Sequence, residues 1–272
     1  MLLRQLGRRL RKQGNSEWLR QFARRHEDVR QSKLPFYRLH PYGGRMPLRG
    51  VDHACVVDRE HAIFFHRIPK NANSSLVTSI SQLMQDSELS TAIADKRRLK
   101  RLQICPSELS EDEAKAVDGY FKFFVVRNPY DRVLSAYLSK VVRHAKLGKP
   151  SKIYGGSQPA TEAPSFEEFC KILADGGLYV NRHWTPQIDY LIFPKERYDF
   201  IARLESIDRD FEVLAQKLGR SSAGSGMVAE DPKHRTNASA RRQEFYTDAL
   251  YDVVYDLYRA DFEAFGYDRS DH

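Results

Sequence analysis

Short runs of β-prone apolar residues alternate along the chain with segments whose apolar residues recur at helical spacing. One run, AIFFHRI at residues 62–68, is followed by apolar positions between 76 and 83 at intervals of one, three and three. A second run, FKFFVV at 121–126, precedes an apolar stripe between 133 and 141. Each pattern predicts a strand, a loop and a helix in that order.

Residues that favour helix ends support these predictions. Asn128 can cap the second helix with Pro129 in its first position, and SEDE at residues 110–113 resembles a capping box. The most regular stripe runs from Leu250 to Phe262, and Gly266 can end that helix. Alternating strands and helices favour a three-layer α/β/α domain with a mainly parallel central sheet. Two further helices are expected at residues 165–174 and 208–218.

Segments rich in proline, glycine and serine divide the chain. Residues 35–50 predict a connecting loop, so we expect a basic arm and linker over 1–50 and a catalytic domain over 51–272. Residues 146–164 are polar and rich in glycine and proline, which predicts a mobile loop that can form a lid or an acceptor site. Another break is expected at 219–226.

The composition is that of an ordinary globular protein, with 272 residues, 41% of them hydrophobic, and a formal net charge of +8. No stretch approaches the roughly 18 apolar residues of a membrane span, and the charged start differs from a signal peptide. We therefore expect a chain that is neither secreted nor membrane-spanning. Three widely separated cysteines, in no zinc-binding spacing, indicate a reducing compartment and predict no metal site.

The positive charge is concentrated in the N-terminal arm. Residues 1–34 hold ten basic and three acidic side chains, and the rest of the chain is nearly balanced. A nucleic-acid-binding domain usually carries a basic patch on its folded body, so we expect no nucleic-acid partner. Leucines at near-helical spacing among the arginines suit peripheral contact with an anionic membrane or an acidic protein, and a solvated arm or a helix packed on the body explains them equally well.

Candidate chemistry lies in the turns that follow the two predicted strands. In HRIPKNANSSLV, residues 66–77, Lys70 and two serines fall at the start of a helix, where backbone N–H groups bind anions. Asn71 and Asn73 stand where a phosphate loop often has glycine, and asparagine tolerates left-handed backbone angles. The alternative is a helix start with an ordinary side-chain cap and an incidental lysine.

The second turn offers a matching anion site. Arg127 follows the second strand and Ser135 lies two helical turns further on. An arginine can bind an oxyanion through two parallel hydrogen bonds, and a hydroxyl can add a third. Two such sites at the carboxyl ends of neighbouring strands indicate a ligand with an anionic group at each end.

These motifs resemble those of sulfotransferases that use 3′-phosphoadenosine 5′-phosphosulfate (PAPS), in particular the Golgi-type carbohydrate sulfotransferases of the chondroitin and HNK-1 branch and their bacterial relatives. IPKNANSSL is similar to the family's 5′-phosphosulfate loop, and VVRNPYDRVLSAYLSK to its 3′-phosphate motif. NRHWTPQ with YDFIARLESIDRDFEVL, and the closing HRTNAS and FYTDALYDVVYDLYRADFEAFGY, match in the same order. Asn128 stands where the family often has aspartate.

The resemblance implies a P-loop-like sulfotransferase fold and assigns roles to individual residues. Lys70 would hold the 5′-phosphosulfate and stabilise the departing oxygen. The loop would be formed by Asn71, Ala72, Asn73, Ser74, Ser75 and Leu76. The 3′-phosphate would be bound by Arg127 and Ser135. The cofactor would be covered by Lys233, Arg235 and Asn237.

The acceptor hydroxyl also needs a base, and we expect His183 because it lies in a polar segment and histidine titrates near neutral pH. A packed core histidine beside Trp184 is the alternative. His66 and Glu88 are held in reserve as the base.

Three functions remain open from the sequence. The first is transfer of a sulfuryl group from PAPS to a carbohydrate, glycolipid or similar hydroxyl acceptor, without a metal. The second is a phosphotransferase, which is disfavoured because no acidic magnesium ligand is evident after a strand. The third is a non-catalytic nucleotide-binding scaffold. The resembling Golgi enzymes carry a membrane anchor and paired cysteines that this sequence lacks, so we expect a bacterial, cytoplasmic enzyme.

Overall fold

A four-stranded sheet forms the centre of the computed structural model, which describes residues 26–84, 103–149, 153, 162–220, 227 and 236–271. The strands lie in the order β1 (Cys55–Asp58), β2 (Ile63–His66), β3 (Phe121–Val126) and β4 (Phe200–Arg203). β1 is antiparallel to β2, while β2, β3 and β4 are mutually parallel. The carboxyl ends of these three parallel strands therefore meet at one edge of the sheet.

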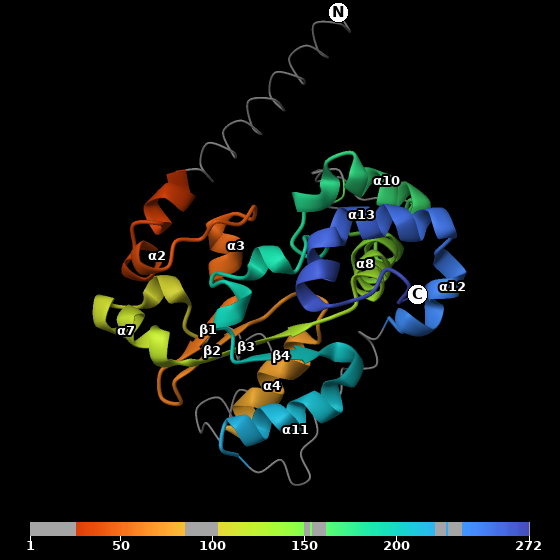
Figure 1. Cartoon of the computed structure of the whole chain (residues 1–272). Coiled ribbons are helices and arrows are strands. Elements are labelled where there is room, and N and C mark those ends of the chain that lie inside the picture. Colours follow the sequence, from red (N-terminus) through yellow and green to blue (C-terminus); the bar gives the residue numbers. More distant parts are fainter. Residues whose placement is uncertain are drawn as a thin grey trace, which may run out of the picture.

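Helices cover both faces of the sheet (Figure 1). Phe65 and Phe123 pack on one face with α4 (Asn73–Leu83) and α11 (Ile207–Lys217). Phe64 and Phe124 point to the opposite face, where they join the core formed with α8 (Pro129–Tyr137) and α13 (Asp248–Phe265). The alternation of side chains along each strand thus supplies two apolar cores, and the predicted three-layer α/β/α fold with a mainly parallel sheet is confirmed.

The predicted helix ends are also confirmed. The Asn128 side chain accepts a hydrogen bond from the Tyr130 N–H at the start of α8, and Gly266 ends α13 with a φ of 63°. Ser110 begins α7 with the expected capping box. The described residues also include the helices α2 (Pro35–Leu39), α3 (Leu48–Asp52), α7 (Glu111–Ala116), α9 (Arg143–Lys146), α10 (Phe166–Ala174) and α12 (Arg242–Phe245), with a π-helical turn at Leu138–Val142 and several 3₁₀ turns.

The prediction of a connecting loop at residues 35–50 is wrong. Pro35 begins α2, and α3 starts at Leu48. Phe36 is fully buried between the rings of Phe64 and Phe193, which explains why this segment folds onto the domain. Proline and glycine indicated a linker, but the aromatic residues between them contribute to the core.

Several predictions fall on segments outside the described residues. These include most of the basic arm, the greater part of the expected mobile loop, and Glu88. In the part of the chain that the structure describes, no helix combines the length and the apolar character that a membrane crossing requires.

Candidate active site

The loop after β2 starts α4 without any side-chain cap. Ala72 is the N-cap residue, no side chain accepts a bond there, and the first turn holds no acidic residue. α7 and α10, by contrast, begin with serine capping boxes and acidic first turns. The alternative of an ordinary capped helix start is therefore wrong, and the first-turn N–H groups and helix dipole of α4 suit an anion.

The backbone of this loop is left-handed at two residues other than the expected asparagines. Lys70 has a φ of 75° and Ala72 a φ of 52°. Asn71 instead turns inward, where it is 1% exposed and donates to the Val125 carbonyl at 2.8 Å. The Ser75 hydroxyl and the Asn73 side-chain oxygen are buried and have no partner among the described residues.

The structure brings the two predicted anion sites together. The Arg127 guanidinium donates to the Lys70 carbonyl at 3.3 Å, so the end of β3 touches the loop after β2. The Lys70 ammonium donates to the Ser139 hydroxyl at 2.8 Å, in the π-helical turn that continues α8. Such π-helical turns occur frequently at functional sites.

Ser135 lies on α8 within reach of the C-terminal part of the chain. It is buried, and its hydroxyl lies 3.0 Å from the Thr236 hydroxyl. Asn237 follows with an exposed side chain and a φ of 47°. Lys233 and Arg235 lie outside the described residues, so their predicted contact with the cofactor stays a prediction.

A buried amide holds these elements in register. Gln187 is fully buried, and its side-chain oxygen accepts from the Asn71 amide at 2.6 Å and from the Arg127 N–H at 2.9 Å. Its amide nitrogen donates to the Arg127 carbonyl at 2.8 Å. The Asp261 carboxylate on α13 in turn accepts from the Gln187 and Ile188 backbone N–H groups, each at 2.8 Å. One side chain therefore positions both predicted anion sites.

Two charged side chains are buried beneath this network. Burial raises the pKa of Asp261 to about 6, against the lowering effect of Arg132 and of its own hydrogen bonds. Arg132 is also fully buried, and its Nε donates to the Pro69 carbonyl at 3.2 Å. Its two terminal nitrogens have no partner among the described residues. Arg132 therefore acts on Asp261 through its charge and not through a hydrogen bond.

His183 lies in the same cationic surroundings. Burial lowers its pKa to about 2, and the charges of Lys140, Arg182, Lys70 and Arg132 add to this effect. Its Nδ1 lies 2.7 Å from the Asn181 side-chain oxygen, which accepts and so places the proton on Nδ1. The imidazole is therefore neutral at physiological pH, with the lone pair on Nε2.

His66 and Trp184 are both buried in the core of the protein. His66 is fully buried between the Cys55 thiol and the Tyr198 hydroxyl, at 3.4 and 2.6 Å, which leaves it no route to a substrate. The Trp184 indole is buried and donates to the Gly177 carbonyl. Trp184 therefore belongs to the core.

A sulfotransferase family model matches residues 53–268, a range that includes the sheet, the loop after β2 and α13. The chain belongs to the sulfotransferase family.

The chain is also similar, at low sequence identity, to curated carbohydrate sulfotransferases. It is 28% identical to carbohydrate sulfotransferase 12 of Xenopus laevis over 177 residues, which cover 56% of this chain and 41% of the relative. It is 24% identical to carbohydrate sulfotransferase 10 of Mus musculus over 252 residues, which cover 81% of this chain and 68% of the relative. It is 27% identical to carbohydrate sulfotransferase 14 of the same species over 184 residues, which cover 62% of this chain and 47% of the relative. The chain therefore spans about two fifths of the length of the Xenopus relative. No solved structure matches it.

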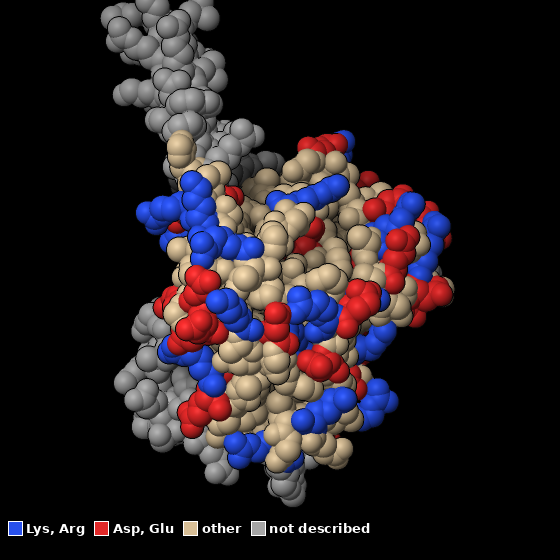
Figure 2. Space-filling view, turned by 60° about the vertical axis from the view of Figure 1, so that its left-hand side comes forward, with Lys and Arg blue, Asp and Glu red and all other residues tan. Residues whose placement is uncertain are grey.

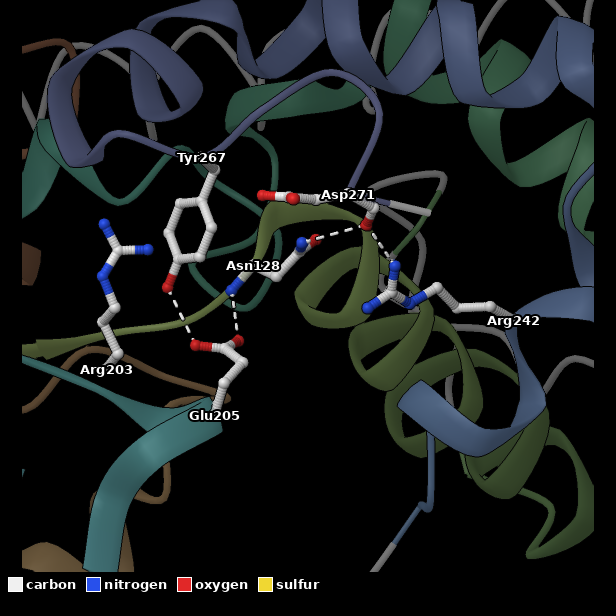
Figure 3. A pocket seen from close by; sticks show the side chains of 6 residues that line it. All are labelled: Asn128, Arg203, Glu205, Arg242, Tyr267 and Asp271. Carbon is white, nitrogen blue, oxygen red and sulfur yellow. Dashed lines mark hydrogen bonds between the residues drawn. The ribbon is translucent and has the colours of Figure 1, made fainter. Parts of the chain in front are cut away.

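A pocket of about 400 Å³ opens beside Asn128, at the carboxyl ends of β3 and β4 (Figure 3). The Arg203 guanidinium lies over the Tyr267 ring at 4.5 Å. Glu205, just after β4, accepts from the Asn128 N–H at 2.6 Å and from the Tyr267 hydroxyl at 3.0 Å. An acidic residue thus does follow a strand at this edge, contrary to our expectation, because β4 was not predicted. The remaining walls are Arg242 and Asp271.

Charge on the surface of this sulfotransferase is mixed on the face seen in Figure 2, where Lys and Arg are interspersed with Asp and Glu.

In the described residues, Asp52, His53 and Cys105 form one group of metal-ligand type, with ligand atoms within 4.8 Å of one another. The Asp52 oxygens already accept from Tyr37 and Ser107, at 2.7 to 2.9 Å. This carboxylate is satisfied without an ion.

Sequence reasoning missed four residues of the site, namely Gln187, Asp261, Arg132 and Lys140. Gln187 lies in the NRHWTPQ segment that we selected because of His183, but the sequence did not indicate that Gln187 contacts Asn71 and Arg127. Asp261 interrupts the apolar stripe of α13 with a fully buried carboxylate. A charged residue on the buried face of a helix is the signal that could have found it.

Proposed function

We propose that this protein transfers a sulfuryl group from PAPS to a hydroxyl of a carbohydrate. The observation that carries the proposal is the contact between the two predicted anion sites, with Arg127 bonded to the uncapped loop that presents Lys70. The carbohydrate sulfotransferases among the relatives support the class of acceptor. PAPS, when bound, supplies the sulfuryl group and a leaving phosphate.

Residues of the loop would hold the phosphosulfate end. The N–H groups at the start of α4 and the Lys70 ammonium provide positive charge, and the unpartnered Ser75 hydroxyl provides a donor. Arg127 and Ser135 would hold the 3′-phosphate. Because negative charge accumulates on the departing phosphate, Lys70 stabilises the transition state more than the ground state.

The pocket of Figure 3 suits the nucleoside end of the same donor. Glu205 and Asp271 disfavour a phosphate there, whereas the stacked Arg203 and Tyr267 side chains provide flat surfaces for a ring. Asn128, which follows Arg127 in the chain, lines this pocket, so a donor held by Lys70 and Arg127 would extend toward it. The donor would then lie across the carboxyl ends of β2, β3 and β4.

His183 would accept the proton of the acceptor hydroxyl. Its neutral state, with the lone pair on Nε2, is the form that a base requires. The cations that depress its pKa also attract the anionic donor, and bound negative charge raises the pKa of a nearby histidine. Donor binding would therefore strengthen the base at the moment when it is needed.

A phosphotransferase is the second candidate, because Glu205 follows a strand at the same edge. Its two carboxylate oxygens are engaged by Asn128 and Tyr267, which disfavours a magnesium ion there.

A cytoplasmic location stays a proposal, supported by three buried cysteines without disulfides. Bacterial origin, a glycolipid acceptor and membrane contact through the arm stay predictions, and the relatives compared are from animals.

The proposal is tested by incubating the purified protein with sulfur-labelled PAPS and a panel of oligosaccharides and glycolipids. We expect label in at least one saccharide, and no phosphoryl transfer from γ-labelled ATP to the same panel. His183→Gln should lower kcat by about 10²–10⁴-fold with PAPS binding retained, because only the base is removed. Phosphoryl transfer without sulfuryl transfer would replace the proposal with the phosphotransferase.

A further inference from the structure

The Gln187 side chain is shared by the two predicted phosphate sites. It lies just before the 3₁₀ turn Ile188–Tyr190 and is fully buried. Its amide uses all four of its hydrogen-bonding positions, because the oxygen accepts from Asn71 and Arg127 and the nitrogen donates to Arg127 and Asp261. A side chain engaged in this way restricts the groups on both of its sides.

On the side of the phosphosulfate loop, Gln187 acts through Asn71. Asn71 lies between Lys70 and Ala72, whose φ values of 75° and 52° are unfavourable for residues with a Cβ atom. Such a backbone persists only where neighbouring contacts hold it. The Asn71 amide nitrogen supplies two of these contacts, at 2.8 Å to the Val125 carbonyl on β3 and at 2.6 Å to Gln187. The shape of the loop that would receive the 5′ group therefore depends on Gln187.

On the other side, Gln187 holds the Arg127 backbone at the point where the sheet ends. β3 pairs with β4 as far as Val126, which lies opposite Arg203. Arg127 comes next, and its N–H and carbonyl form hydrogen bonds of 2.9 and 2.8 Å with Gln187. The side-chain amide thus takes the place of a neighbouring strand for one residue. The position of the guanidinium that would bind the 3′-phosphate depends on this pairing.

We propose that Gln187 couples the two phosphate sites, so that each phosphate of the donor strengthens the binding of the other. This inference rests on the proposed function and deepens it, because Gln187 becomes a positioning residue that favours the 3′-phosphorylated donor. A phosphate on the loop would hold Asn71 in place, which keeps the shared Gln187 oxygen directed at the Arg127 N–H. Ordering one site then lowers the cost of ordering the other, and thermodynamic linkage makes the effect equal in both directions.

A second contact joins the two sites without Gln187. The Arg127 guanidinium donates to the Lys70 carbonyl at 3.3 Å, which is longer than the bonds of 2.6 to 2.9 Å that link Gln187 to Asn71 and Arg127. Gln187→Met keeps both partners of this longer contact. The variant therefore separates the route through the amide from the direct one.

A cycle of four ligands tests the inference without requiring turnover. The ligands are adenosine, AMP, 3′-AMP and 3′-phosphoadenosine 5′-phosphate, which carry neither, one or both phosphates. Calorimetry of the full-length protein gives their affinities, with displacement titrations for the weak ligands. We expect the 3′-phosphate to tighten binding about 10²-fold when the 5′-phosphate is present and about 10-fold when it is absent, which is a coupling of about 10-fold. Purely additive phosphates in the wild-type protein would overturn the inference.

Variants assign the coupling to Gln187. Gln187→Met keeps the length of the side chain, removes its polar atoms and should reduce the coupling to about 1-fold. Gln216→Met, at an exposed position of α11, is the matched control and should keep the wild-type coupling. A uniform loss of packing weakens all four ligands alike and leaves their ratio unchanged. If the melting temperature shows that Gln187→Met does not fold, Asn71→Ala removes the other end of the link and should abolish the coupling too.

The same titrations separate this inference from the proposed function. Failure of 3′-phosphoadenosine 5′-phosphate to bind the wild-type protein would contradict both. Tight binding of that ligand with additive phosphates contradicts the coupling alone and leaves the proposed function intact. A coupling that survives in a folded Gln187→Met protein would show that the direct contact between Arg127 and Lys70 carries it, against the inference.

Discussion

Lys70→Ala is expected to lower kcat about 10²–10³-fold for the saccharide that the panel identifies. The ammonium carries a full positive charge next to the uncapped start of α4, and under the proposed function it would lie beside the departing phosphate. Lys70 has a left-handed φ of 75°, and alanine tolerates that conformation as well as lysine does, as Ala72 shows at 52°. The measurement is initial-rate kinetics with sulfur-labelled PAPS, with kcat and KM determined separately.

Lys115→Ala is the matched control for this prediction. Lys115 is exposed on α7, where it pairs with Glu111. We expect its kcat to equal that of the wild type, and both variants to keep the wild-type melting temperature. A Lys70→Ala protein that is folded and fully active would show that another cation neutralises the leaving group.

Asp261→Ala should reduce the free energy of unfolding by about 3–5 kcal/mol. The Asp261 carboxylate accepts the backbone N–H groups of Gln187 and Ile188 and interacts with the charge of Arg132. Alanine would leave those buried donors unpaired and remove a negative charge that acts on the Arg132 guanidinium. Because Gln187 positions Asn71 and Arg127, donor binding should weaken too. Urea unfolding followed by circular dichroism provides the free energy.

Asp261→Asn removes the titrating carboxyl and keeps one of its two accepting oxygens. The pKa of Asp261 is raised from 3.8 to about 6 in the folded protein, so between these values the folded state binds more protons than the unfolded state. The contribution of this carboxyl to stability is thus fully present below about pH 4 and declines as the pH rises to 6. We expect the difference in unfolding free energy between wild type and Asp261→Asn to fall by about 3 kcal/mol over that range. A difference independent of pH would show that Asp261 titrates normally.

Local sequence signals were sufficient for the framework of the site. The strand before Lys70 and the strand before Arg127 were predicted because each is a compact β-prone run followed by a helical stripe, and parallel pairing then places their ends together. Asn128 and Gly266 fixed helix ends through interactions within a few residues. These features depend on short-range chemistry, which a single sequence displays.

The missed features depend on contacts between distant segments. β1 and β4 were not predicted, and they become strands by pairing with β2 and β3. The role of Gln187 arises from partners about 60 and 116 residues away. The aromatic residues of α2 were assigned to a linker because their packing partners, such as Phe193, lie far along the chain.

Under the proposed function, this edge of the sheet binds a nucleotide with phosphates at both its 5′ and 3′ positions. Calorimetric titration with 3′-phosphoadenosine 5′-phosphate and with AMP tests it most directly, for wild type, Arg127→Ala and the surface control Arg259→Ala. We expect the bisphosphate to bind about 10²-fold more tightly than AMP to wild type and to the control, since the 3′-phosphate adds two charge-assisted hydrogen bonds. Arg127→Ala should lose this preference while keeping its melting temperature. Equal binding of the two nucleotides to the wild-type protein, or no binding of either, would contradict the account.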